Sequence, residues 1–228
     1  MRDGSALKAT LHAIDGKGYG AYKQIKGTYD LGHFQVSVDR VQVDPFAPPS
    51  LVRVILDPST AGLPEELTSD AAGRVAASDF LARRFAEAVG RHDGGDRDSA
   101  ISIGKPRQQV LERTSVLIAE DRIEARITVG LPASGRSVRG RQAARTLTEA
   151  LPRIVEDALL HRNLDAEALR EHVSLYRDQE SLRSQLAGAG LVAFVGEGAI
   201  LPRRSGDSDA PMDDGAVPFQ SPASLRVG

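Results

Sequence analysis

The chain has 228 residues, of which 41% are hydrophobic, so it can bury a substantial apolar core and is expected to be globular. Charged residues nearly cancel to a formal net charge of -2, so any attraction to nucleic acid or anionic lipid must come from local patches. The absence of cysteine excludes disulfides, thiolate zinc sites and cysteine nucleophiles. No apolar run approaches the roughly 20 residues that span a bilayer, and we therefore expect a cytoplasmic protein without membrane contact.

The first half of the chain alternates helical and strand signals. Ser5 is expected to cap a short helix, which a glycine-rich loop at 15–20 ends. Alternating apolar residues predict one strand over 29–43 and, after a proline-rich turn, a second strand over 51–56. Apolar residues four apart predict an amphipathic helix over 75–89, followed by a polar loop or linker at 92–99.

The second half predicts a hairpin, two helices and an irregular end. Apolar segments at 110–118 and 123–129 flank a polar turn, which makes the sheet at least partly antiparallel. Two helices are expected, over 141–160, with Pro152 as an internal break, and over 165–186, capped by Asp165. A short strand is expected over 191–195. The fold class is α+β, with a mixed, partly antiparallel sheet, flanking helices and an irregular C-terminal tail.

Lysine, tyrosine and glycine are concentrated in the segment 17–29. Its glycines would let a phosphate approach the backbone, its lysines could bind phosphates, and its tyrosines could stack on bases or on an adenine ring. The alternative is a structural loop with packed tyrosines and solvated lysines. The candidate binding residues in this segment are Lys17, Tyr19, Tyr22, Lys23 and Lys26.

Arginines are concentrated between residues 126 and 145, where no acid occurs between Glu124 and Glu149. The planar guanidinium fork suits phosphate, and the loop leads into a predicted helix N-terminus, so a nucleotide phosphate or a polyanion could dock there. A charged loop that is merely exposed to water is the alternative. The candidates are Arg136, Arg139 and Arg141.

Several kinds of catalytic or metal site are disfavoured. The five histidines show no metal-ligand spacing with one another or with carboxylates. No nucleophile elbow is present, and no set of serine, histidine and acid stands out. The glycines at 16–20 follow a predicted helix, whereas a dinucleotide fingerprint follows a strand. We therefore assign no catalytic and no metal-binding residue.

A series of unusual strings occurs in order along the chain. They are Ile14-Asp15-Gly16-Lys17-Gly18-Tyr19-Gly20-Ala21-Tyr22-Lys23, Asp44-Pro45-Phe46-Ala47, Val129-Gly130-Leu131-Pro132-Ala133, Gly140-Arg141-Gln142-Ala143, Gly190-Leu191-Val192-Ala193-Phe194-Val195 and Gly198-Ala199-Ile200-Leu201-Pro202-Arg203-Arg204-Ser205-Gly206. With the closing segment 219–227, these strings resemble the N-terminal half of the predicted ATPases of the ABC class.

The resemblance implies a division of the chain. Residues 1–201 would be the N-terminal domain, and residues 202–228 a linker and the first strand of an ATPase core in the same polypeptide or gene. That core would bind ATP and magnesium, and the full-length protein could form a homodimer. Because ABC cores commonly stack an aromatic ring on adenine near their first strands, the resemblance makes Phe219 the candidate for stacking. The alternative is that Phe219 anchors the tail onto the domain's own core.

The motifs that such a core uses for hydrolysis are missing from these residues. The Gly-Lys pairs at 16–17 and 104–105 are followed by Gly18 and Pro106, whereas a phosphate loop needs a serine or threonine after its lysine to hold magnesium. No cofactor is therefore expected on this chain by itself.

Three functional hypotheses remain. The first is an accessory domain that positions nucleic acid, in particular RNA, beside an ATPase core. The second is a free-standing phosphate- or RNA-binding module without ATPase activity. The third, a nucleotidyl-transfer enzyme suggested by residues 14–17, is weakened because such enzymes place their reactive lysine where this chain has Ala13.

We predict that the chain alone hydrolyses no ATP, because it lacks a phosphate-loop lysine followed by a magnesium-binding hydroxyl. The measurement is phosphate release by the purified chain against a buffer control. ATP turnover above that control, abolished by a change at Lys17, would contradict the prediction.

Overall fold

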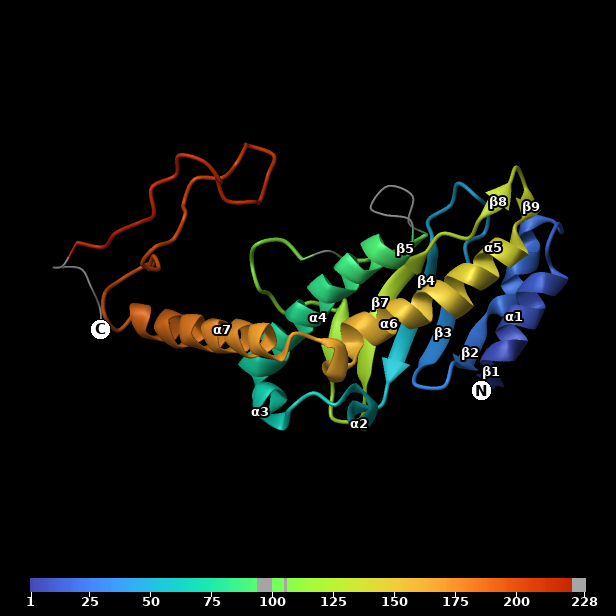
Figure 1. Ribbon diagram of the computed structural model, residues 1–228, viewed down its shortest axis with the longest axis horizontal. Helices are drawn as coiled ribbons and strands as arrows, with labels where there is room; N and C mark the ends of the chain where they lie inside the picture. Colours follow the sequence, from blue (N-terminus) through green and yellow to red (C-terminus); the bar gives the residue numbers. More distant parts are fainter. Residues whose placement is uncertain (94–99, 105, 223–228) are drawn as a thin grey trace.

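The computed structural model describes residues 1–93, 100–104 and 106–222 (Figure 1). Its strands are β1 (Arg2–Asp3), β2 (Gly27–Asp30), β3 (Gln35–Arg40), β4 (Ser50–Leu56), β5 (Ile101–Ile103), β6 (Val116–Ile118), β7 (Ile123–Val129), β8 (Ala133–Ser134) and β9 (Ser137–Val138). Its α-helices are α1 (Gly4–Ala13), α2 (Pro58–Ala61), α3 (Glu65–Thr68), α4 (Ala71–His92), α5 (Gly140–Arg145), α6 (Leu151–Leu159) and α7 (Ala166–Leu186). Tyr19–Ile25 (η1) and His161–Asn163 (η3) are 3-10 helices, and Thr146–Ala150 (η2) is a π-helix that joins α5 to α6.

Seven strands form one mixed sheet. The order is β1-β2-β3-β4-β7-β5. Strands β5 and β6 pair with successive parts of the same edge of β7. Strand β1 is parallel to β2, and the remaining pairs are antiparallel. The fold class expected from the sequence, α+β with a partly antiparallel sheet, is confirmed.

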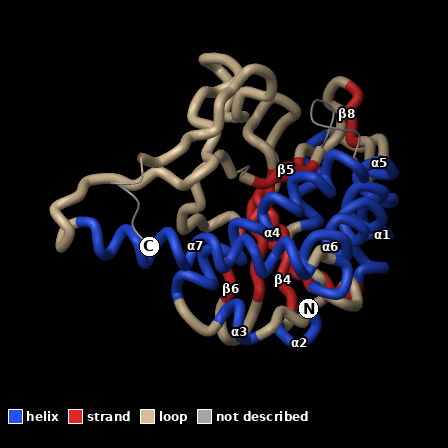
Figure 2. Tube along the Cα trace, turned by 60° about the vertical axis from the view of Figure 1, so that its left-hand side comes forward, coloured by secondary structure: helices blue, strands red, loops and turns tan. Residues whose placement is uncertain are grey.

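One face of the sheet is covered by helices, with α1, α4, α5 and α6 lying across the strands (Figures 1 and 2). Alternate residues of the central strands point into this layer, so that Val52, Val54 and Leu56 of β4 are buried. They meet the apolar side of α4, where Leu81 and Phe85 are fully buried. The core therefore lies between the sheet and a single layer of helices.

The opposite face of the sheet carries polar residues tied across strands. Arg53 of β4 donates to Asp39 of β3 at 2.6 Å and lies 3.4 Å from Glu124 of β7. The hydrogen bond from Arg53 lowers the pKa of Asp39. Because charged side chains pair across the strands here, this face needs no helical cover.

Several predicted elements are confirmed with small shifts. The helix expected over 75–89 is α4, the hairpin is β6–β7, and Asp165 caps α7 through the N–H groups of Glu167 and Ala168. The helix expected over 141–160 is continuous through η2, and the break expected at Pro152 is instead a wider π turn just before that residue. The cap of α1 is Asp3 rather than Ser5, because the Asp3 carboxylate accepts the N–H of Ser5.

Two strand predictions are wrong. The single strand expected over 29–43 is a hairpin of β2 and β3, because the chain turns at Gly32, which has φ +90° and donates its N–H to Asp30 Oδ1. The strand expected over 191–195 is absent, and those residues are exposed and irregular. A short apolar run forms a strand only where a neighbouring strand accepts its backbone bonds.

The end of the described chain is irregular, as expected. Residues 196–221 fold back on themselves: Gly198 N–H donates to Phe219 O, and Phe219 N–H donates to Ala199 O. No helix of the described residues has both the length and the apolar character required to cross a membrane. The loop expected at 92–99 lies largely outside the described residues, as does the end of the segment 202–228, in which a linker and a first core strand were expected.

Glycine at position 140 permits α5 to contact α1. A Cβ atom on Gly140 would lie 2.0 Å from Leu11 O and 3.2 Å from Asp15 Cα, both backbone atoms that cannot move aside cheaply. The close approach seats the start of α5 against the end of α1. This contact fixes where the loop that precedes α5 emerges.

We predict that Gly140→Ala lowers the free energy of unfolding by about 2 kcal/mol or more, since overpacking against backbone forces a shift of α5. Urea denaturation followed by circular dichroism measures the change. Gly90→Ala is the matched control: Gly90 lies within α4 with open space around it, so alanine should leave stability unchanged or raise it. Equal stability of Gly140→Ala and the wild type would contradict the close packing.

Candidate phosphate-binding surface and helix junction

Two segments about 120 residues apart in sequence are joined by backbone hydrogen bonds. Gly16 N–H donates to Val138 O at 2.9 Å, and Val138 N–H donates to Lys17 O at 2.8 Å. Tyr19 N–H donates to Arg136 O at 2.9 Å. The glycine-rich loop is thus an added strand-like segment beside β9, and Gly16, with φ +76°, makes the turn out of α1 that this pairing requires.

The arginines are presented by the β8–β9 hairpin and by the start of α5. The two-residue turn of the hairpin is Gly135-Arg136, in which Gly135 takes the left-handed conformation (φ +58°) and Arg136 lies at the tip. Arg139 immediately precedes α5 and Arg141 lies in its first turn; both are exposed. A hairpin this short gives little sequence signal, which is why the loop was expected to be irregular.

Lys17, Arg136, Arg139 and Arg141 therefore lie on one surface, here called the hairpin surface. One acid lies beside it: Asp15 Oδ1 accepts the N–H of Arg141 at 3.3 Å, and Asp15 Oδ2 is 3.5 Å from its Nε. The Arg141 side chain is still 81% exposed, so this ion pair is weak. Four basic side chains against one carboxylate leave a local excess of positive charge on a protein whose net charge is -2.

The tyrosines of the glycine-rich segment are core residues. Tyr22 is fully buried and donates to Pro132 O at 2.7 Å, and Tyr19 is 5% exposed and donates to Leu131 O at 3.0 Å. Burial, with the charge of Asp44, raises the pKa of Tyr19 to about 12, and burial also raises the pKa of Tyr22. Stacking on a base would require either ring to leave the core. Their hydroxyl groups instead anchor η1 to the segment that leads into the hairpin.

The remaining predicted binding residues come from the end of η1 and from the C-terminal tail. Lys23 is exposed on η1. Lys26 follows η1, and its charge reaches Asp39 on the open face of the sheet. Phe219 is half-buried in the folded-back tail, paired through its backbone with residues 198 and 199. Adenine stacking by Phe219 stays a prediction.

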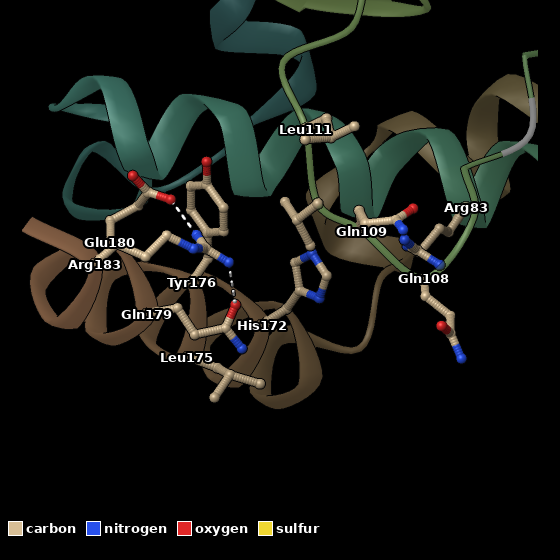
Figure 3. A pocket seen from close by; sticks show the side chains of 11 residues that line it. Arg83, Gln108, Gln109, Leu111, His172, Leu175, Tyr176, Gln179, Glu180 and Arg183 are labelled. Atoms are coloured by element: carbon tan, nitrogen blue, oxygen red, sulfur yellow. Dashed lines mark hydrogen bonds and ion pairs between the residues drawn. The ribbon is translucent and has the colours of Figure 1, made fainter. Parts of the chain in front are cut away.

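A second feature, which the sequence did not suggest, is a cavity of about 800 Å³ between α4, α7 and the loop at 108–111 (Figure 3). His172 and Tyr176 of α7 lie on one side of this cavity, and Arg83 of α4 and Leu111 of the loop on the other. Its volume is in the range of small-molecule sites. We call this region the helix junction.

A buried carboxylate holds the helix junction together. The side chain of Asp79, on α4, is fully buried; its Oδ2 lies 2.6 Å from Arg83 Nε and 3.3 Å from His172 Nε2, and its Oδ1 lies 2.6 Å from Arg113 Nη1. Burial alone would raise the pKa of Asp79, but the approach of His172 and the hydrogen bond and charge of Arg83 outweigh it, so the pKa is lowered. The sequence signal that could have indicated this buried carboxylate is an acidic residue on the apolar side of α4, next to Phe80 and Leu81.

Helix α7 is docked only along its first half. Leu169 and Val173 are buried, and Arg177 pairs with Asp70 at 2.8 Å and donates to Glu66 O at 2.8 Å. Further along, Leu182 is 41% exposed, and the helix extends beyond the body of the molecule (Figure 1). The second half of α7 therefore has a face without a covering layer in the described chain.

We predict that Asp79→Asn lowers the free energy of unfolding by about 3 kcal/mol, because it leaves Arg83 and Arg113 partly buried without their counter-charge. Asp178→Asn on the exposed side of α7 is the control and should change little. Because the native pKa of Asp79 is lowered, its contribution is fully present above the ordinary carboxyl pKa of about 3.9 and is lost as pH falls through the native value. Wild-type stability should thus fall more steeply than that of Asp79→Asn below about pH 4; parallel pH profiles would contradict this account.

Neither Lys17 nor Lys105 is followed by a hydroxyl residue in the sequence. Among residues 1–93, 100–104 and 106–222, no three histidine or carboxylate side chains gather as metal ligands would.

Comparison with known families matches two models in succession. The model described as "ATPase of the ABC class N-terminal" matches residues 5–162, which include the whole sheet except β1, together with α5, α6 and the hairpin surface. The model described as "P-loop domain" of the ABC ATPases matches residues 165–228, which include α7. No curated protein sequence matches the chain.

The two matched ranges are separated by residues 163–164, at the end of η3. The helix junction therefore combines α4 and the 108–111 loop from the first range with α7 from the second. The division expected after residue 201 stays a prediction. The part matched by the P-loop model contains no Gly-Lys-Ser or Gly-Lys-Thr. With more than half of its residues matched by the N-terminal model, the chain belongs to the family of ABC-class ATPases.

Proposed function

We propose that this chain is the accessory part of an ABC-class ATPase and that it holds nucleic acid, in particular RNA, on the hairpin surface beside the ATPase core. The observation that supports this most is the pairing of the glycine-rich loop with β9, which gathers Lys17 and Arg136 from distant parts of the sequence. ATP and magnesium would belong to the core. No step of hydrolysis is assigned to the residues described.

The chemistry of the hairpin surface suits a polyanion better than a small neutral ligand. Arg136 at the hairpin tip and Arg139 ahead of α5 are exposed. Among the described residues, neither arginine forms an ion pair with a carboxylate. Guanidinium groups contact phosphate in a bidentate manner and carry little sequence information by themselves. Binding is therefore expected to be sensitive to salt and tolerant of sequence.

Helix α7 supports the accessory role. It begins the range that matches the P-loop domain, yet His172 and Arg177 tie it to the N-terminal body. The uncovered face of its second half, where Leu182 is exposed, would pack against the ATPase core. In that arrangement α7 would connect the core to the body that carries the hairpin surface.

We predict that changing Arg136, Arg139 and Arg141 together to alanine weakens the binding of a labelled single-stranded RNA at least about tenfold at low salt. The slope of log affinity against log salt should also become shallower by about 2, because three phosphate contacts no longer release counterions. Fluorescence anisotropy across a salt series measures both.

The control removes equal charge elsewhere, by changing Arg162, Arg170 and Arg203 together to alanine; all three are exposed. If the two triple variants weaken RNA binding equally, the effect comes from the lost net charge and not from the hairpin surface. An unaffected Arg136, Arg139 and Arg141 variant would remove the hairpin surface from the binding site.

A further inference from the structure

A separate polar cleft of about 410 Å³ lies along the helix that joins α5, η2 and α6. It is lined by His92, Asp93, Gln142, Arg145, Thr146, Glu149, Ala150 and Arg153. None of these residues belongs to the hairpin surface. The cleft is therefore a separate candidate site.

The cleft is built on the π-helix η2. The N–H of Leu151 donates to Thr146 O, five residues back, so this turn is wider than the α-helical turns on either side. Three of the lining residues, Thr146, Glu149 and Ala150, are on this turn. Because π turns are rare and occur frequently at functional sites, their presence in a cleft points to a retained function.

The acids near the cleft are already paired with cations. Glu149 accepts from Lys8 Nζ at 3.0 Å, and that hydrogen bond, with further help from the charges of Arg145 and Arg153, lowers the pKa of Glu149. Asp157, one turn beyond Arg153, is 2.7 Å from His92 Nε2 and 3.3 Å from Arg91 Nη2.

The two arginines of the cleft have no such partner. In the described part of the chain, neither Arg145 nor Arg153 has a carboxylate within ion-pair distance, and both are exposed. Asp93 also lines the cleft, and its Oδ2 accepts the N–H of Ile101 at 2.6 Å. Two carboxylates, those of Glu149 and Asp93, therefore line the cleft together with Arg145 and Arg153, and Lys8 beside them pairs with Glu149. The guanidinium groups of Arg145 and Arg153 are the cationic groups of this lining that no carboxylate of the described residues holds at ion-pair distance.

We propose that this cleft binds a phosphate group, held between the guanidinium groups of Arg145 and Arg153, with Gln142 and Thr146 as further polar groups beside it. Two planar guanidinium groups that line one polar cleft match the oxygens of a phosphate or pyrophosphate. The proposal does not rest on RNA binding at the hairpin surface. The phosphate could belong to a free phosphorylated metabolite or to a polynucleotide, and the chemistry of recognition is the same.

The test uses sodium pyrophosphate as the probe and two-dimensional amide NMR of the full chain as the readout. Saturable shifts are expected for the amides of 146–150 and of Gln142, and the change of Arg145 and Arg153 together to alanine should weaken this binding at least about tenfold. Changing both to lysine should restore part of the affinity, because charge remains while the fork is lost. The matched control is Arg162→Ala with Arg170→Ala, which should bind as the wild type does.

A pyrophosphate titration that leaves 142–150 unshifted, or that shifts them equally in the alanine variant, would overturn the proposal. Displacement of pyrophosphate by an oligouridine would identify a polynucleotide as the source of the phosphate, whereas saturable binding without displacement would identify a free phosphorylated ligand. The triple variant of the hairpin surface separates the two sites, since it should keep pyrophosphate binding even where RNA binding is lost.

Discussion

The backbone pairing between the loop after α1 and strand β9 is the interaction on which the binding surface depends. The N–H of Gly16 donates to Val138 O and the N–H of Val138 donates to Lys17 O. Gly140, two residues after Val138, lets α5 touch the backbone of Leu11. Neither contact involves a charged side chain. The basic residues are therefore placed by backbone hydrogen bonding and close packing, so they are free to face solvent and a ligand.

Electrostatics act differently at the helix junction. A buried carboxylate destabilises the fold unless it is paired, and Asp79 is approached by Arg83 of α4, Arg113 of the loop before β6 and His172 of α7. The cost of leaving Asp79 unpaired makes the position of α7 sensitive to that one group. Since α7 begins the range that matches the P-loop domain, the same group lies on the path between the N-terminal body and the ATPase core that we propose.

The sequence predicts those parts of the fold whose signals are local. Helix α4 follows from apolar residues at helical spacing, α7 from the Asp165 cap, and the β6–β7 hairpin from its polar turn. The prediction of a strand over 191–195 was wrong because these residues have no neighbouring strand in the described chain. The turn at Gly32 was missed because the residues around it continue the alternating pattern of a strand. Both failures concern pairing partners, which local pattern does not encode.

The candidate site shows the same division. The basic residues themselves could be identified from the composition of their segments. That these segments lie together could not be predicted, because their pairing depends on hydrogen bonds between residues about 120 positions apart. The tyrosines were ambiguous in the sequence, and only the structure shows that Tyr19 and Tyr22 are core residues. Asp79 and the π turn at 146–150 were not identified, since the role of each depends on tertiary surroundings.

The central claim is that the two basic segments are held together before any ligand binds. Native-state hydrogen exchange of the amides of Gly16, Tyr19 and Val138 tests it most directly, because each of these N–H groups donates across the junction of the two segments. The account predicts that the three amides exchange slowly and as a group, with protection approaching that of β4 and β7. Rapid exchange of these amides while the central strands stay protected would contradict it, and would show that the hairpin surface is not formed in advance.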